Sequence, residues 1–195
     1  MITDGTSKLR PGMELVVTRW IAMEGTLQII EEKEPELLEK FPAALIRDAK
    51  NFAAQTDMEQ EKQMAEQLGE AECFPLGEGG ILAARWQMAD RAGVGHAVDL
   101  RKIPIRQETI EICEIFDINP YNLNSHGSML IGTFQGVALA EKLNRQGIPA
   151  VVIGRTDAGA ERVIYNQEIK RYVDKPAKDE IYKILPDIVI GGTEV

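Results

Sequence analysis

The sequence predicts one domain of the mixed α and β (α+β) class. The hydrophobic period switches repeatedly between two and about 3.6 residues along the chain, as expected where strands and amphipathic helices follow each other. Glycine or proline separates most of these periodic segments, which favours short connections. The chain has 195 residues, of which 44% are hydrophobic. This is enough for one buried core and leaves little room for a second domain.

The first part of the chain combines one strand with helices. Residues 15–21 are rich in β-branched and aromatic side chains, which predicts a strand with at least one buried face. Gly25 ends this strand, and Thr26 can cap a following helix. Pro35 and Pro42 each suit the first turn of a further helix, because the N–H that proline lacks has no partner at that position.

The middle of the chain combines three predicted helices with a glycine-rich turn. After Pro42, apolar side chains recur with helical spacing at Leu45, Ile46, Ala49, Phe52 and Ala53. Residues 57–68 are mostly charged, which favours a solvent-facing helix with a narrow apolar stripe. The apolar run 73–76 then leads through the glycine-rich turn, residues 77–80, into a helix over residues 81–92. The side chains expected on the shared apolar face of that helix are Leu82, Trp86 and Ala89.

The remaining segments alternate between strands and helices. The apolar pattern predicts strands over residues 98–100, 128–133 and 150–153, and a hairpin of 163–165 with 169–173. It predicts helices over residues 109–116, 136–146 and 179–185.

Composition excludes several classes of protein. The formal net charge is −9, which disfavours binding to nucleic acid or to an anionic membrane surface. No stretch approaches the roughly 18 consecutive apolar residues of a membrane span, and the first ten residues have no apolar signal core. Cys73 and Cys113 lie far apart, so we expect two free thiols in a reducing compartment rather than a disulfide framework. These features predict a soluble, cytoplasmic protein.

The glycine-rich turn is the strongest candidate for chemistry. It comprises Gly77, Glu78, Gly79 and Gly80, and it stands between a predicted strand and a predicted helix. A helix that begins at such a turn offers free backbone N–H groups and the positive end of its dipole to an anion. The spacing matches neither the Walker pattern nor the dinucleotide fingerprint. By itself, such a turn is more often only a tight connection.

A small polar loop precedes the predicted strand 128–133. Ser125, Gly127 and Ser128 could supply hydroxyl and backbone donors to a ligand, although an ordinary turn explains the pattern equally well. His126 has only His96 as a companion histidine and no cysteine or carboxylate at ligand spacing, so we expect no metal site.

Several segments together resemble one protein family in their order and spacing. They are Leu9-Arg10-Pro11-Gly12-Met13-Glu14-Leu15-Val16-Val17-Thr18 with Gly25-Thr26, Glu78-Gly79-Gly80-Ile81, Trp86-Gln87-Met88-Ala89, Asn119-Pro120-Tyr121, Gly127-Ser128-Met129-Leu130, and residues 147–154. This set resembles the C-terminal domain of the aminoimidazole ribonucleotide (AIR) synthetase-like superfamily. Among its members, the hydrogenase-maturation, carbamoyl-dehydratase branch is the most similar.

The resemblance implies a fold and a division of the chain. The fold would be a two-layer domain, a mixed β-sheet with helices packed on it. Residues 1–12 would form a lead-in, residues 13–184 the domain and residues 185–195 a tail that we leave unassigned. In full-length members an N-terminal domain holds ATP and magnesium, and this sequence carries no counterpart of its acidic ligands. We therefore expect ATP and Mg²⁺ only where a partner domain supplies the site.

The resemblance also fails at one informative place. The related branch has a polar His-Asp-Val-Thr stretch where this chain has Phe74-Pro75-Leu76-Gly77, so a titratable pair and a hydroxyl are missing. We therefore expect a phosphate- or substrate-binding or accessory domain without autonomous catalysis. The alternatives are a subunit of a split ATP-dependent ligase or dehydratase whose ATP-binding domain lies on another chain, and a structural partner in a maturation complex. A homo-oligomer is compatible with all three.

Overall fold

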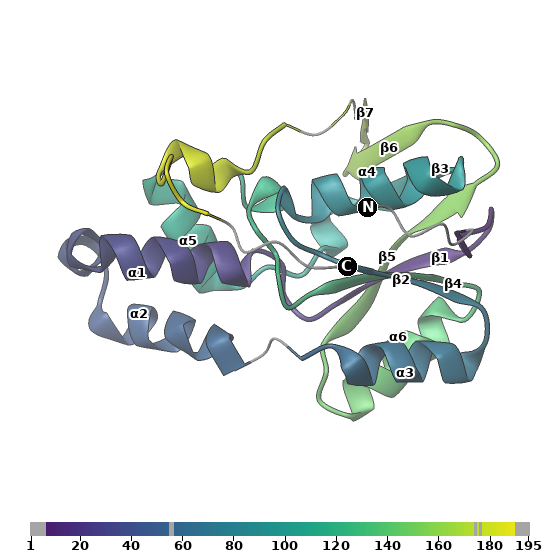
Figure 1. The fold of residues 1–195 in the computed structure, drawn as a ribbon, viewed down its shortest axis with the longest axis horizontal. Coiled ribbons are helices and arrows are strands. Elements are labelled where there is room, and N and C mark those ends of the chain that lie inside the picture. Colours follow the sequence, from purple (N-terminus) through teal and green to yellow (C-terminus); the bar gives the residue numbers. More distant parts are fainter. Residues whose placement is uncertain (1–6, 55–56, 174, 176, 190–195) are drawn as a thin grey trace.

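The strands form one mixed, seven-stranded sheet in the order β2-β4-β1-β5-β3-β6-β7. The computed structural model describes residues 7–54, 57–173, 175 and 177–189 (Figure 1). The strands are β1 (Glu14–Thr18), β2 (Ala71–Pro75), β3 (Gly95–Asp99), β4 (Met129–Thr133), β5 (Ala150–Asp157), β6 (Arg162–Asn166) and β7 (Ile169–Tyr172). Neighbouring strands are antiparallel except β3 and β6, which pair in parallel.

Helices cover both faces of this sheet (Figure 1). They are α1 (Met23–Lys40), α2 (Ala43–Lys50), α3 (Glu59–Leu68), α4 (Gly80–Ala92), α5 (Gln107–Ile115) and α6 (Gly136–Arg145). In β1, Leu15 and Val17 belong to a core shared with α1, α4 and α5, whereas Val16 belongs to a core shared with α3 and α6. The period of two in β1 thus separates two cores. The predicted class, a mixed sheet with helices packed on it, is confirmed, and the structure adds helices on the second face.

Helix α1 consists of two helical segments that join at Lys33, whose backbone angles are not helical (φ −122°, ψ 15°). Pro35 therefore lies in the first turn of the second segment, as predicted, where the N–H that proline lacks would have no helical partner. One element differs from its prediction: the expected final helix 179–185 is a short 3-10 helix, η4 (Glu180–Lys183). Residues 190–195 of the predicted tail lie outside the described residues.

Helix α4 buries a different face from the predicted one. Leu82 and Trp86 are only half-buried, whereas Ile81, Arg85 and Met88 are almost completely buried. Of the three side chains expected on one apolar face, Leu82, Trp86 and Ala89, only Ala89 is buried. The side of α4 that faces the core includes Arg85 instead of Leu82 and Trp86. Within the described residues, none of the helices combines the length and apolar composition that a membrane crossing requires.

Candidate functional site

The glycine-rich turn joins β2 to α4 in a conformation that requires glycine. Gly79 (φ 76°) and Gly80 (φ 60°) both have left-handed backbone angles. A Cβ atom on Gly80 would lie 2.6 Å from the carbonyl oxygen of Tyr121 and 2.7 Å from that of Leu123. The turn therefore packs closely on the loop that leads to β4, and this contact fixes where α4 begins.

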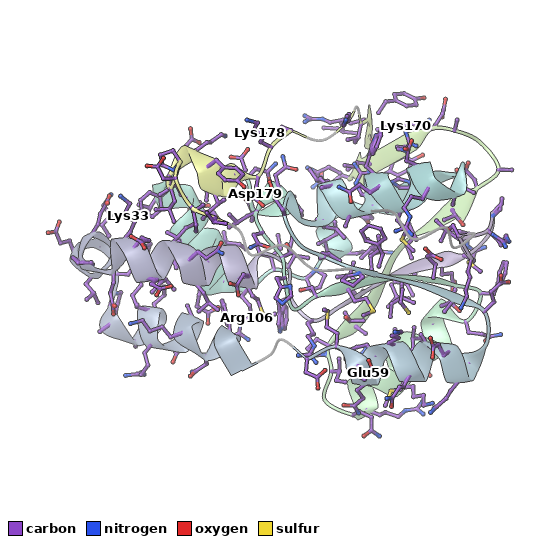
Figure 2. All side chains as sticks on the ribbon, viewed as in Figure 1. Lys33, Glu59, Arg106, Lys170, Lys178 and Asp179 are labelled. Carbon is purple, nitrogen blue, oxygen red and sulfur yellow. The ribbon has the colours of Figure 1, made fainter. Side chains whose placement is uncertain are left out.

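A carboxylate of the same chain occupies the amide end of α4. Asp179, which is 3% exposed, accepts the N–H of Gly79 at 2.6 Å and the N–H of Ile181 at 2.9 Å. Burial raises the pKa of Asp179 above its ordinary value, although the hydrogen bonds from Ile181 and Gly79 lower it. Asp179 therefore takes the place where the sequence predicted an external anion, and Figure 2 shows it beside the first turn of α4.

The polar loop lies against the same turn. The N–H of Ser125 donates to the carbonyl of Gly77 at 3.1 Å, and the N–H of Leu76 donates to the carbonyl of Ser128 at 2.8 Å. Gly127 (φ 91°) allows the loop to turn between the two serines. The structure thus brings the two predicted parts of the site, the glycine-rich turn and the loop, into one region.

Both serine hydroxyls make hydrogen bonds within the protein. The Ser125 hydroxyl donates to the carbonyl of Leu123 and accepts the N–H of Ala22, both at 2.8 Å. The Ser128 hydroxyl donates to the carbonyl of Trp20 at 2.6 Å. Both side chains are fully buried. These contacts attach the loop to the connection between β1 and α1, so both serines hold the loop in place against the glycine-rich turn.

A cleft of about 310 Å³ opens at the start of α4. This α4 cleft is lined by Glu78, Gly79, Ala83, Trp86, Gln87, Lys175, Ala177, Lys178 and Asp179. Of the predicted site residues, only Glu78 and Gly79 line it. The lining combines two exposed lysines, Lys175 and Lys178, with the carboxylates of Glu78 and Asp179.

Sequence reasoning missed most of these lining residues. Asp179 precedes a predicted helix and has the residue type of an N-cap, and its side chain does accept the N–H of Ile181. That signal could have identified the cap, but not its second contact with Gly79. Lys175 and Lys178 flank a proline in a polar segment, a pattern that gives no indication of a site.

The carboxylates of the α4 cleft already have partners within the chain. They belong to Glu78, which accepts the Tyr182 hydroxyl at 3.2 Å, and to the buried Asp179. Both cysteines are free, and burial raises the pKa of the Cys113 thiol to about 12 and that of Cys73 to about 11. Thiols with such pKa values are poor nucleophiles. In the described part of the chain, no cluster of three or more His, Cys, Asp or Glu side chains could hold a metal ion.

The fold and sequence match known proteins. A family model described as "AIR synthase related protein, C-terminal domain" matches residues 11–166. Carbamoyl dehydratase HypE of Rhodobacter capsulatus is 29% identical over 87 residues, which is 43% of this chain and 26% of that protein. The PurL subunit of phosphoribosylformylglycinamidine synthase from Thermosynechococcus vestitus is 32% identical over 111 residues, which is 54% of this chain and 14% of that protein.

A solved structure extends the comparison to nearly the whole fold. The crystal structure of E. coli HypE, a hydrogenase maturation protein, superimposes with a TM-score of 0.70 at 17% identity. The alignment covers 91% of this chain and 54% of E. coli HypE. The chain therefore spans about half the length of that protein, and a smaller share of the two curated relatives.

Proposed function

The chain belongs to the family of AIR synthase related proteins, as a C-terminal domain, and from this premise we propose that its α4 cleft binds a phosphate-containing small molecule. The observation that carries the proposal is the meeting of Lys175 and Lys178 with the amide end of α4 in one open cleft. Ammonium groups and a helix N-terminus both favour a phosphate. The half-buried indole of Trp86 adds a flat apolar wall that suits a base or another planar group of the ligand.

Asp179 sets the conditions for this binding. Its carboxylate already uses the N–H of Gly79, so a phosphate must bind beside Asp179 or displace it. In the described part of the chain, no acceptor lies within hydrogen-bonding geometry of the amides of Ile81 and Leu82, so the helix end retains unpaired donors. Two like charges at close range repel. We therefore expect Asp179 to weaken the binding of a phosphate, and its neutralisation to strengthen that binding.

Catalysis in this proposal requires a second domain. The stretch before the turn is apolar, with Leu76 fully buried, and offers no acid or base to the cleft. ATP and Mg²⁺ would be held by a nucleotide-binding domain that docks on this one. The likeness to HypE over about half of that protein favours a second candidate function, the substrate-facing half of an ATP-dependent dehydratase or ligase.

A thermal-shift titration with inorganic phosphate, sulfate, ribose 5-phosphate and ATP·Mg²⁺ tests the proposal. A ligand that binds only the native chain raises its melting midpoint with the logarithm of ligand concentration. The double variant Lys175→Ala/Lys178→Ala should weaken binding by about tenfold or more, because it removes two charged donors. Lys170→Ala is the matched control, since Lys170 lies on β7 and does not line the cleft (Figure 2).

Tryptophan fluorescence gives a second readout. The chain has two tryptophans, so Trp20→Phe leaves Trp86, in the wall of the cleft, as the only indole. Ligand binding should change its emission with the same midpoint as the thermal shift. Absence of both responses for every phosphate tested, in the wild type and in Asp179→Ala, would refute the proposal.

A further inference from the structure

The indole of Trp86, which forms part of the lining of the α4 cleft, is covered by an arginine that lies outside that cleft. The guanidinium of Arg162, in β6, stands 4.5 Å from the ring centre of Trp86. Arg162 is not among the described residues that line the cleft. A guanidinium at this distance is attracted by the electrons of an indole ring. Arg162 therefore holds the indole from outside the cleft and opposes its rotation.

An ion pair fixes the guanidinium of Arg162. Its Nη2 atom donates to the carboxylate of Asp90 at 2.9 Å. Asp90 follows Trp86 by four residues in α4, so both side chains leave the helix on the same side. One arginine of the sheet thus contacts two residues on one side of the helix. Because a guanidinium is rigid and planar, these two contacts together define its position beside the indole.

The other neighbours of Arg162 restrict its alternative conformations. Arg85 is almost completely buried, and its Nη1 atom contacts Nε2 of His96 at 2.7 Å. Burial and the positive charge of Arg162 lower the pKa of Arg85 to about 10. The two guanidinium groups repel each other, which disfavours conformations that turn Arg162 toward the core. The Nε atom of Arg162 is itself buried, so the inner part of the side chain is closely surrounded.

The backbone of Arg162 is joined to a second part of the cleft lining. Its carbonyl accepts the N–H of Val173, directly after β7, at 2.9 Å. The chain that supplies Lys175 and Lys178 to the cleft continues from Val173. The contact with the indole and the start of the lysine-bearing segment, residues 173–178, therefore meet at one residue of β6.

We propose that Arg162 is a positioning residue of the α4 cleft, which holds the Trp86 indole in one orientation and so makes the cleft select phosphates that carry a planar group. The inference rests on the proposed function, because it concerns the ligand of the same cleft. The phosphate itself binds at the lysines and the helix start, so it does not depend on the indole. A planar group stacks on the indole, and an indole that is already ordered loses less conformational freedom on binding. Arg162 therefore acts on selectivity through Trp86.

AMP and ribose 5-phosphate test this selectivity, because they differ only in the planar base. The full chain is titrated with each of them, and with inorganic phosphate, by thermal shift. In the wild type, AMP should bind about fivefold or more tightly than ribose 5-phosphate, as expected when one base stacks on an aromatic ring. Arg162→Met should reduce this preference by about threefold, and should change the affinity for inorganic phosphate much less.

A double-mutant cycle separates positioning from a purely structural role. In the Trp86→Leu background, Arg162→Met should have no further effect on the ratio of the two affinities, since Arg162 acts only through the indole. Arg162→Lys, which keeps a cation near the ring, should retain part of the preference. An unchanged ratio in Arg162→Met, or the same loss with and without Trp86, would overturn the proposal.

Fluorescence without ligand tests the contact with Trp86 separately from the proposed function. In the Trp20→Phe background, where Trp86 is the only indole, Arg162→Met should lower the fluorescence anisotropy and increase quenching by acrylamide. Asp90→Asn, at an exposed residue, should give smaller changes of the same sign, and Arg101→Met, at an exposed arginine, should give none.

The two kinds of measurement fail in different ways. Unchanged anisotropy and quenching in both Arg162→Met and Asp90→Asn would show that Arg162 does not order the indole, whatever the cleft binds. The expected fluorescence changes without binding of any phosphate would refute the function of the cleft and the selectivity, and would confirm only that Arg162 orders Trp86.

Discussion

The carboxylate of Asp179 accepts the backbone N–H of Gly79 at 2.6 Å, although the two residues are 100 positions apart in the chain. This contact docks the segment before η4 on the first turn of α4. It also gives the glycine-rich turn an anion from the same molecule. A carboxylate of the same chain therefore occupies a backbone N–H of the turn, the kind of group that we expected to face an external anion.

Asp179→Asn should change how stability depends on pH. Burial raises the pKa of the Asp179 carboxyl above its ordinary 3.8, so the native chain holds this proton more tightly than the unfolded chain does. The resulting contribution to stability is complete below that ordinary value and is lost as pH rises through the native pKa. Asparagine keeps an acceptor for Gly79 and stays neutral. The difference in free energy of unfolding, wild type minus variant, should therefore fall as pH rises.

Urea unfolding at about pH 3.5, 5 and 7 measures this difference. Asp187→Asn, at an exposed aspartate near the same end of the chain, is the control and should leave the profile unchanged. If the free energy of unfolding varied with pH in the same way in the wild type and in Asp179→Asn, the raised pKa of the buried Asp179 carboxyl would be contradicted.

Gly80→Ala should destabilise the protein more than Gly93→Ala. Both glycines have left-handed angles, so both substitutions carry a backbone cost of about 1–2 kcal/mol. At Gly80 the new Cβ also meets two carbonyl oxygens at less than 3 Å, whereas at Gly93 no atom lies within 4 Å. The added overpacking should cost about 1–3 kcal/mol more. Chemical denaturation of both variants gives the comparison, and equal losses would show that the turn can move away from the loop.

His96→Gln should make the protein less sensitive to acid. Burial lowers the pKa of His96 to about 3, whereas an unfolded histidine takes up its proton near 6.5. The native state therefore loses stability as pH falls through this window, by up to about 1.4 kcal/mol per pH unit. Glutamine can still accept from Arg85 and does not titrate. His126→Gln, in the polar loop, is the control. If the free energy of unfolding of His96→Gln fell with pH as steeply as that of the wild type, the lowered pKa of His96 would be refuted as the cause of acid sensitivity.

The local patterns of the sequence predicted most of the elements correctly. The β-branched run before Gly25 became β1, and the helical spacing after Pro42 became α2. The glycine-rich turn stands where it was expected, between β2 and α4. Each of these features depends on residues close together in the chain, which is why periodicity and turn chemistry were enough to find them.

Local sequence patterns could not show which charged side chains are buried. Arginine is rarely buried without a partner, so the residue type of Arg85 gives no indication that it lies in the core. Its contact with His96 depends on how α4 lies over β3, and no spacing in the sequence describes that packing. The sequence suggested Ser125 and Ser128 as possible donors to a ligand, but it gave no sign that their hydroxyls contact Ala22 and Trp20 in the β1–α1 connection.

The sequence by itself determined the class of fold, the family and the position of the glycine-rich turn. Only the tertiary structure decided what that turn faces, because the Asp179 carboxylate and the two lysines of the α4 cleft arrive from the far end of the chain. Local propensity acts over a few residues, whereas a binding site consists of groups that packing brings together. Burial then sets the charge and the hydrogen-bonding capacity of those groups, and burial is a property of the folded chain alone.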